Sequence, residues 1–507
     1  MFLSSSKRLL CAASLLASGL LTAPALAEVT LPNVFSDHMV LQRNQANKVW
    51  GKAAPGEKVT VSIGTQSKEA TAAADGAWQV TLEPLQPGDP LKLVAKAAGG
   101  AGEVAINDVL VGEVWVCSGQ SNMAYGLSQM DGGPAEVAAA DRPQIRLLTI
   151  PSKGSQTPIW SQPNAHWTIC TPQTAGRFSA VGYIFAKTVQ DSIKVPVGII
   201  NNAWAGSRGE AWIDRKYFEG HPNLIPLVER YDNFAKQMAE LEAKGSQVPR
   251  DLRDNVTGDD RPANAWNGIV ASHAGYGIKG VLWYQGEGNT PRGHQYRELM
   301  PVLIDSWRKE WGEPDMPFYW VNLPGNEAPK PEPGDSQWAE LRESQTITAA
   351  KVKNTAQALA IDLGGDGNLH PRNKKDIGLR LANIALGRDY GIPKPYLYAS
   401  YKTMKADGNK ITLTFDSPNG KLHALNAGEP LKGFAIAGAD KKFVWADATA
   451  NPDGSITVSS DKVPSPASVR DAWADNPVCN VYDDAKLPLT PFRTDDWKLS
   501  TEGVLVH

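Results

Sequence analysis

Apolar and polar residues alternate in the N-terminal part of the chain, and this pattern predicts short β-strands. Around residues 59–63 and 78–82, single polar residues separate Val, Ile, Leu and Trp. Asp75-Gly76 lies between two such runs, as a hairpin turn does. The alternation therefore predicts a small antiparallel β-sandwich module over residues 28–107.

Nearly continuous apolar runs replace this alternation in the middle of the chain. The three clearest runs span residues 108–117, 195–201 and 278–284. Such runs are typical of parallel strands that are covered on both faces. Segments with apolar residues at helical spacing, such as 179–191 and 297–311, lie between and after them. The pattern predicts an α/β domain over residues 108–392, with a mostly parallel sheet flanked by helices.

Strand-like alternation returns near the C-terminus. Pro393 and Pro395 separate it from the α/β region, and Asp407-Gly408 supplies a turn signal between two apolar runs. We expect a second small β module over residues 393–507.

The first 27 residues have the pattern of a secretory signal peptide. Lys7 and Arg8 precede an apolar run of 14 residues, and Ala25-Leu26-Ala27 offers the small residues that signal peptidase recognises. A membrane span needs about 20 apolar residues, so a membrane anchor is disfavoured. We expect a periplasmic or secreted protein after cleavage near Ala27.

Charge and composition exclude several kinds of partner. The net charge is −3, and no basic block or acidic tail interrupts the chain, so neither nucleic acid nor a membrane surface is an expected partner. The eight His residues are scattered without ligand spacing, which predicts no metal site. The three Cys residues after the signal peptide do not form a disulfide pattern. The oligomeric state stays open.

Polar segments rich in Gly follow each of the three buried runs. In open α/β sheets, ligands bind beyond the carboxyl ends of the strands, so these segments are the first candidates for a site. They are SGQSNM (118–123), WAGSRGEAW (204–212) and WYQGEGN (283–289). A Ser that follows a buried strand is most often only a helix N-cap. SGQSNM alone is therefore a weak indication of catalysis.

These three motifs and GNLHPRNKKDIGLRLA (367–382) together resemble the sialate O-acetylesterase family of carbohydrate esterases. That family also includes bacterial xylan and xyloglucan acetylesterases, and it is similar to the SGNH hydrolases. The resemblance extends to LPNVFSDHMVLQRN near the start of the expected mature chain. It implies an SGNH-like catalytic domain between two β modules, which removes O-acetyl groups from sugars without a cofactor.

Within this resemblance, the nucleophile falls on Ser121 and the catalytic base on His370. A Ser hydroxyl needs a base to take its proton, and a neutral His suits that role. The Ser121 and Gly206 N–H groups are the expected oxyanion-hole donors. Gln285 is the preferred side-chain donor, and Asn289 is the alternative and otherwise a substrate contact.

The third member of the triad is open. SGNH enzymes carry an Asp three residues before the His, and Gly367 occupies that position here. Either Asp366 orients the His370 ring, or a backbone carbonyl or a distant carboxylate does so. An orienting acid fixes the tautomer and does not accept the proton.

Three more residues are candidates for substrate binding. Arg208, Glu287 and Asn122 lie in the motifs, but Arg208 and Glu287 are equally able to form a salt bridge that shapes the cleft. A non-catalytic carbohydrate-binding protein on the same fold is the main alternative function, because two β modules flank the core and the chain has 16 Trp. A large separation between Ser121 and His370 would favour that alternative. The acetylated sugar itself, from sialic acid to plant hemicellulose, is left open.

Overall fold

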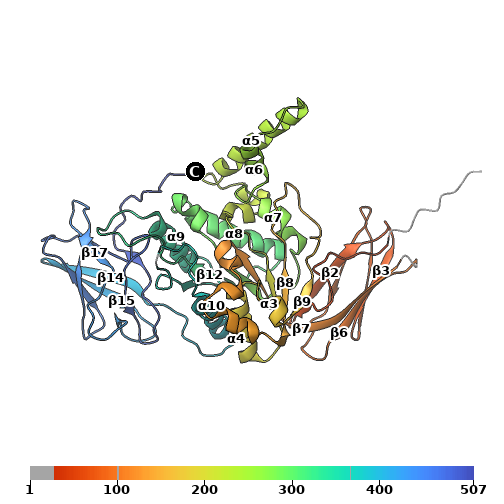
Figure 1. The fold of residues 1–507 in the computed structure, drawn as a ribbon, viewed down its shortest axis with the longest axis horizontal. Helices are drawn as coiled ribbons and strands as arrows, with labels where there is room; N and C mark the ends of the chain where they lie inside the picture. The colour runs from red at the N-terminus through yellow and green to blue at the C-terminus, as the bar shows by residue number, and fades with distance from the viewer. Residues whose placement is uncertain (1–27, 100–101, 366, 507) are drawn as a thin grey trace, which may run out of the picture.

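Three regions follow one another along the long axis of the molecule (Figure 1). This computed structural model describes residues 28–99, 102–365 and 367–506. The predicted signal peptide and the candidate acid Asp366 lie outside the described residues.

The N-terminal region is built mostly from short antiparallel pairs, and its first strand pairs in parallel with β7 (Glu103–Gly119). Its strands are β1 (Val40–Gln42), β2 (Asn47–Lys52), β3 (Lys58–Ile63), β4 (Gln66–Thr71), β5 (Ala77–Leu82) and β6 (Leu91–Ala97). β2 pairs with β5, while β3 pairs with both β4 and β6. Val59, Val61 and Ile63 are buried as the alternation predicts.

One long strand joins this region to the centre of the molecule. β7 (Glu103–Gly119) pairs with β6 through residues 103–109 and with the central strands through residues 113–119. The boundary expected at residue 107 therefore falls inside a continuous strand. The change from alternating to continuous apolar residues marks the point where β7 becomes covered on both faces.

The central sheet is parallel except at one edge. Its order is β13-β12-β11-β7-β10-β8-β9, and only β9 runs antiparallel to its neighbour. Beyond β7, the strands are β8 (Arg142–Thr149), β9 (Trp167–Cys170), β10 (Val197–Asn201), β11 (Gly280–Tyr284), β12 (Phe318–Asn322) and β13 (Thr355–Leu359). Gly119 is aligned with Tyr284, so β7 and β11 end together at the carboxyl edge.

Two pairs of helices cover this sheet (Figure 1). One pair is α4 (Ala180–Ile193) with α10 (Lys374–Arg388), and the other is α8 (Tyr296–Trp311) with α9 (Gln337–Lys351). α4 begins where Ser179 Oγ accepts the Gly182 N–H at 3.1 Å. Gly312, with φ of 72°, ends α8 in a left-handed turn.

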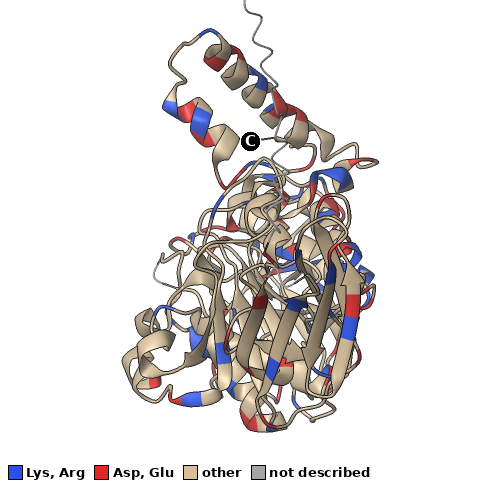
Figure 2. Ribbon diagram, turned by 90° about the vertical axis from the view of Figure 1, so that its right-hand side faces the viewer, with Lys and Arg blue, Asp and Glu red and all other residues tan. Residues whose placement is uncertain are grey.

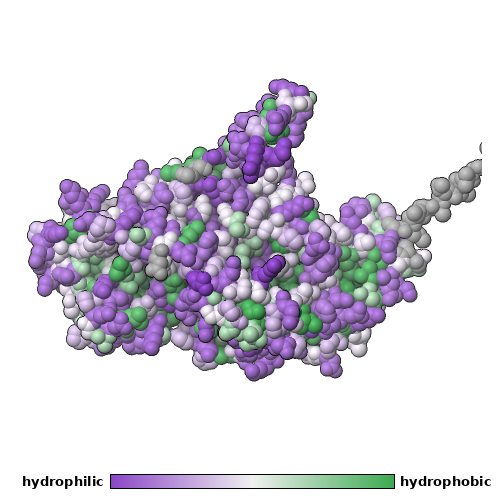
Figure 3. Space-filling model, in the orientation of Figure 1, coloured by the Kyte–Doolittle hydropathy of each residue, from purple (hydrophilic) through white to green (hydrophobic). Residues whose placement is uncertain are grey.

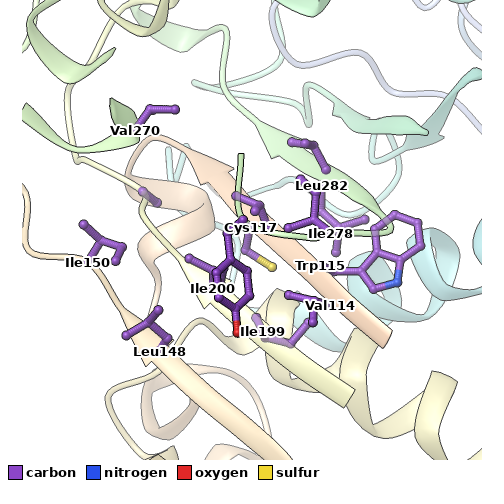
Figure 4. Packing of buried hydrophobic residues seen from close by; sticks show 14 of the residues in the cluster. Val114, Trp115, Cys117, Leu148, Ile150, Ile199, Ile200, Val270, Ile278 and Leu282 are labelled. Atoms are coloured by element: carbon purple, nitrogen blue, oxygen red, sulfur yellow. The ribbon is translucent and has the colours of Figure 1, made fainter. Parts of the chain in front are cut away.

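The core lies between the sheet and these helices. Figure 4 shows side chains from β7, β8, β10 and β11 packed together, among them Trp115, Cys117 and Ile199. Trp266, Trp283, Trp307 and Trp311 contact one another through their rings farther along the core. Much of the high Trp content therefore serves packing. Cys117 and Cys170 are free and buried, and Cys479 is free and half-buried.

The C-terminal region has its own apolar core, formed by residues such as Ile411, Phe434 and Val458. Its longer strands are β14 (Ser400–Asp407), β15 (Lys410–Asp416), β17 (Phe434–Ala437), β19 (Asp447–Ala450), β20 (Ile456–Ser459) and β21 (Ser468–Asp471). The buried Arg342 of α9 donates to Ala474 O at 2.9 Å and Asp475 O at 2.7 Å. Buried polar contacts thus fix this region to the central domain.

A helical hairpin projects from the central region. It consists of α5 (Ile225–Ala243) and α6 (Arg250–Thr257) and stands clear of the body (Figure 1). Charges of both signs are interspersed on the face in Figure 2, and the surface in Figure 3 is mostly hydrophilic with small apolar patches. Across the described ranges, no helix is both long and apolar enough to cross a bilayer.

Candidate active site

The nucleophile candidate follows the end of β7 directly. Gly119 has φ of 129°, and a Cβ there would lie 2.1 Å from Tyr284 O. Only Gly allows this conformation and this close approach to β11. After Gln120, the chain turns into the short helix α1 (Ser121–Ala124). The turn brings Ser121 to the carboxyl edge of the sheet, where ligands bind in α/β folds.

His370 reaches Ser121 from the loop between β13 and α10. Its Nε2 lies 2.7 Å from Ser121 Oγ. The His370 N–H donates to Asn368 Oδ1 at 2.9 Å, and the Tyr125 ring stacks near the imidazole with a centroid separation of 6.5 Å. The two residues that the resemblance pairs are therefore within hydrogen-bond distance.

Burial and a nearby cation both act on His370. Partial burial lowers the pKa of His370 below its ordinary value, and the charge of Lys374 lowers it further. A lower pKa keeps the imidazole neutral, which is the form that accepts a proton.

The loop after β10 packs against the nucleophile turn. The Trp204 N–H donates to Gly119 O at 2.9 Å. Gly206 has φ of 85°, and a Cβ there would lie 2.4 Å from Asp259 Oδ2. Gly206, the candidate oxyanion-hole donor, thus lies on a loop in contact with the turn that carries Ser121.

The two amide side chains after β11 are engaged inside the protein. Gln285 is fully buried, and its Nε2 donates to Ser207 O at 3.2 Å and to Asn289 Oδ1 at 2.7 Å. Asn289 Nδ2 donates to Glu210 Oε2 at 2.8 Å. Both hydrogens of the Gln285 amide are used, so it would have to release one to bind an oxyanion. The contacts give both residues a supporting role for the 206–210 loop.

Asn122 makes its hydrogen bonds inside the protein. It is fully buried, and its Nδ2 donates to Glu287 Oε1 at 2.6 Å and to Leu369 O at 3.0 Å. Its Oδ1 accepts a hydrogen bond from Lys374 Nζ. Three protein contacts therefore occupy the groups that we expected to bind substrate.

Arg208 and Glu287 have different partners from those considered in the sequence. Arg208 Nε lies 3.3 Å from Asp260 Oδ1, while Glu287 is buried against Asn122. Burial raises the pKa of Asp259 and of Asp260, and for both residues Arg208 partly offsets this effect. Arg208, Asp259 and Asp260 form a charged group beside Gly206, which we call the acidic rim.

The comparisons with known proteins agree on one family. Residues 111–248 and 264–387 match the family described as carbohydrate esterase, sialic acid-specific acetylesterase. The chain belongs to this family. It is accordingly an esterase of the carbohydrate-esterase class, and an acetylated carbohydrate suits it as substrate.

Related proteins extend the match over most of the chain. The sialate O-acetylesterase of Mus musculus is 28% identical over 90% of this chain and 92% of its own length. The Homo sapiens sialate O-acetylesterase is 28% identical over 70% of each chain. The crystal structure of a carbohydrate acetylesterase from Xanthomonas citri superposes with a TM-score of 0.80. It is 36% identical and covers 92% of this chain and 100% of its own.

Sequence patterns did not single out several residues around the site. Lys374 stands four positions after His370 in the HPRNK segment, and this spacing was its only signal. Asp259 and Asp260 lie in residues 249–263, which the family match leaves out. Within the described ranges, no cluster of His, Cys, Asp or Glu could hold a metal ion.

Proposed function

We propose that this protein is a carbohydrate O-acetylesterase that works through a covalent acetyl-Ser121 intermediate. The observation that carries the proposal is the 2.7 Å separation of Ser121 Oγ and His370 Nε2. The central domain is, in this proposal, SGNH-hydrolase-like. In support, its nucleophile follows β7, its candidate oxyanion Gly follows β10, and its base precedes the last helix of the domain.

In the first half of the reaction, Ser121 Oγ attacks the carbonyl carbon of the acetyl group while His370 Nε2 takes the hydroxyl proton. The carbonyl oxygen becomes an oxyanion, which the Ser121 and Gly206 N–H groups bind. The C–O bond to the sugar then breaks. The sugar oxygen leaves with the proton from His370, and the acetyl group stays on Ser121.

Water completes the second half. His370 Nε2 takes a proton from the water as its oxygen attacks the acetyl carbon, and a second oxyanion forms in the same place. When this intermediate collapses, Ser121 regains its proton from His370, and the product leaves as acetic acid, which ionises to acetate in water. The lowered pKa of His370 favours this base role.

We further propose that the bound sugar is neutral. The acidic rim holds two carboxyl groups and one guanidinium, so a negative charge on the substrate would meet like charge there. Carboxylates accept hydrogen bonds from sugar hydroxyls, which a neutral acetylated glycan offers in excess. Acetylated hemicellulose has this chemistry, whereas sialic acid carries a carboxylate.

The signal-peptide pattern of residues 1–27 supports action outside the cytoplasm, in the periplasm or after secretion. The alternative of a non-catalytic carbohydrate-binding protein depended on a large separation between Ser121 and His370. Their hydrogen-bond distance gives that alternative no support.

The test is acetate release by the Ser121→Ala variant from a panel of acetylated glycans. Loss of a serine nucleophile in a hydrolase lowers kcat by about a million-fold, so we expect no measurable turnover at an unchanged melting temperature. The wild-type protein, denatured during turnover, should carry an acetyl group on the peptide that contains Ser121. Substantial turnover by a folded Ser121→Ala protein would refute the mechanism.

A further inference from the structure

Asn122 contacts the chain on both sides of the catalytic base. It directly follows Ser121, and its Nδ2 donates to the carbonyl of Leu369, which directly precedes His370. Its Oδ1 accepts from Lys374 Nζ at the first position of α10. One buried side chain next to the nucleophile therefore holds residues 369 and 374, on either side of His370.

Glu287 fixes the orientation of the Asn122 amide. Its Oε1 accepts the second Nδ2 hydrogen at 2.6 Å, so both amide hydrogens and the amide oxygen are assigned. A flipped amide would place its oxygen against Glu287 and its hydrogens against Lys374. Only one orientation satisfies all three neighbours.

Lys374 is enclosed by groups that keep it in place. Its Nζ lies 4.9 Å from the Tyr125 ring centroid and 5.2 Å from that of Tyr284, which suits a buried cation. Burial lowers the pKa of Lys374 to about 7, and the charge of Glu287 opposes that effect. Burial also raises the pKa of Glu287, against the hydrogen bond from Asn122.

We propose that Asn122, Lys374 and Glu287 are positioning residues that set the alignment of His370 on Ser121, and we call them the clamp. This inference rests on the proposed function. The clamp acts through the backbone of residues 369–374 and touches neither substrate nor the reacting atoms. Misplacing a catalytic group by about 1 Å costs about a hundred-fold in rate, so a clamp of this kind controls kcat.

The clamp also gives His370 its charge environment. Among the residues that the structure describes, the groups that face the imidazole are Ser121 and Tyr125 on the α1 side and Lys374 on α10. Lys374 in turn faces the carboxyl group of Glu287 and the rings of Tyr125 and Tyr284. Since Lys374 disfavours a second positive charge nearby, its removal should raise the pKa of His370.

The first test is the double variant Asn122→Asp with Glu287→Gln, which reverses the donor and acceptor between these two positions. The Gln amide can donate to the new carboxylate, which also accepts from Lys374, but nothing at position 122 can donate to Leu369 O. We expect kcat about a hundred-fold lower, KM within a few-fold of wild type, and a similar melting temperature.

The second test is the double variant Lys374→Met with Glu287→Gln, which removes both buried charges together so that neither is left alone. We expect a lower kcat and an acidic limb of the kcat/KM profile that moves to higher pH. A residue with a merely structural role would not move that limb. If the first double variant does not fold, this second one still tests the inference.

The matched control is Asn480→Asp in the C-terminal region. Asn480 is also buried and donates to a backbone carbonyl, that of Pro430, at 3.0 Å. The Asn480→Asp variant should lose some stability and keep the wild-type kcat. Folded clamp variants with wild-type kcat and an unmoved acidic limb would overturn the inference while Ser121→Ala stays inactive. Turnover by Ser121→Ala would instead overturn the proposed function.

Discussion

Ser121 Oγ and His370 Nε2 lie 2.7 Å apart, although 249 positions separate the two residues in the chain. Ser121 is held by the end of β7 at the centre of the sheet, and His370 by the loop that leads from the edge strand β13 into α10. The parallel order of the sheet brings both to one edge. The distance thus depends on the whole central domain and on the contacts of the loop around His370.

The pH dependence of the reaction should reflect the environment of His370. Only the neutral imidazole accepts a proton, and burial together with Lys374 lowers its pKa below the ordinary value of 6.5. As pH falls, activity should therefore persist below the pH at which an exposed His becomes charged, and then decline. We expect a kcat/KM profile measured from about pH 4.5 to 8.5 to show an acidic midpoint below that of an unperturbed His. A midpoint at or above 6.5 would contradict this environment.

Substitution of Gly206 tests whether this residue of the loop after β10 is an oxyanion-hole donor. In the Gly206→Ala variant, the new Cβ would meet Asp259 Oδ2 at 2.4 Å, and the backbone would keep a φ of 85° that Ala disfavours. Removing one oxyanion-hole donor costs about a hundred- to a thousand-fold in kcat. We expect a kcat loss of that order because the loop has to move.

Gly220→Ala is the control for this variant. Gly220 has nearly the same φ, 83°, but a Cβ there would meet no atom within 4 Å. Its backbone strain should be similar, so its melting temperature should fall about as much while its kcat stays near wild type. Equal kcat for the two variants would show that Gly206 is not part of the oxyanion hole.

The strand ends could be predicted from the sequence because local features determine them. Continuous apolar runs mark buried parallel strands, and the Gly residues after them allow tight turns such as Gly119. The pairing of Ser121 with His370 came from the resemblance to a family, because no local pattern links residues so far apart. The expected boundary at 107 lies within β7, because this one strand pairs with β6 and also with the central strands.

The roles of the polar residues could not be predicted in the same way. Gln285 and Asn122 have the chemistry of ligand-binding amides, but burial assigns their hydrogens to Ser207, Asn289, Glu287 and Leu369. Such partners come from distant segments and depend on packing. The two Asp residues of the acidic rim follow the projecting hairpin, outside the motifs that mark the strand ends.

Asp366 is a candidate for the acid that orients His370. Because Gly367 occupies the usual acid position, we expect Asp366→Asn to reduce kcat/KM less than His370→Ala does. Replacing the acid by Asn in a protease triad costs about ten-thousand-fold, through the wrong tautomer. The comparison uses one acetylated substrate at several pH values. An equal loss in the two variants would make Asp366 a full triad member, and a silent Asp366→Asn would assign the orientation to another group.

Asp259 tests whether the acidic rim selects for the charge of the sugar. The Asp259→Asn variant removes one carboxylate beside Gly206 while keeping its shape. Its kcat/KM on an O-acetylated sialic acid should rise relative to that on a neutral acetylated xylo-oligosaccharide. We expect a several-fold change in this ratio, on the order of 1 kcal/mol for a partly exposed charge. Salt should weaken the effect in the wild-type protein, because ions screen repulsion between exposed charges.

Asp251→Asn is the control, since this exposed residue of α6 carries the same charge away from Gly206. A ratio that changes equally in both variants, or in neither, would show that the rim does not discriminate by charge, and the preference for a neutral sugar would then have to come from another part of the cleft.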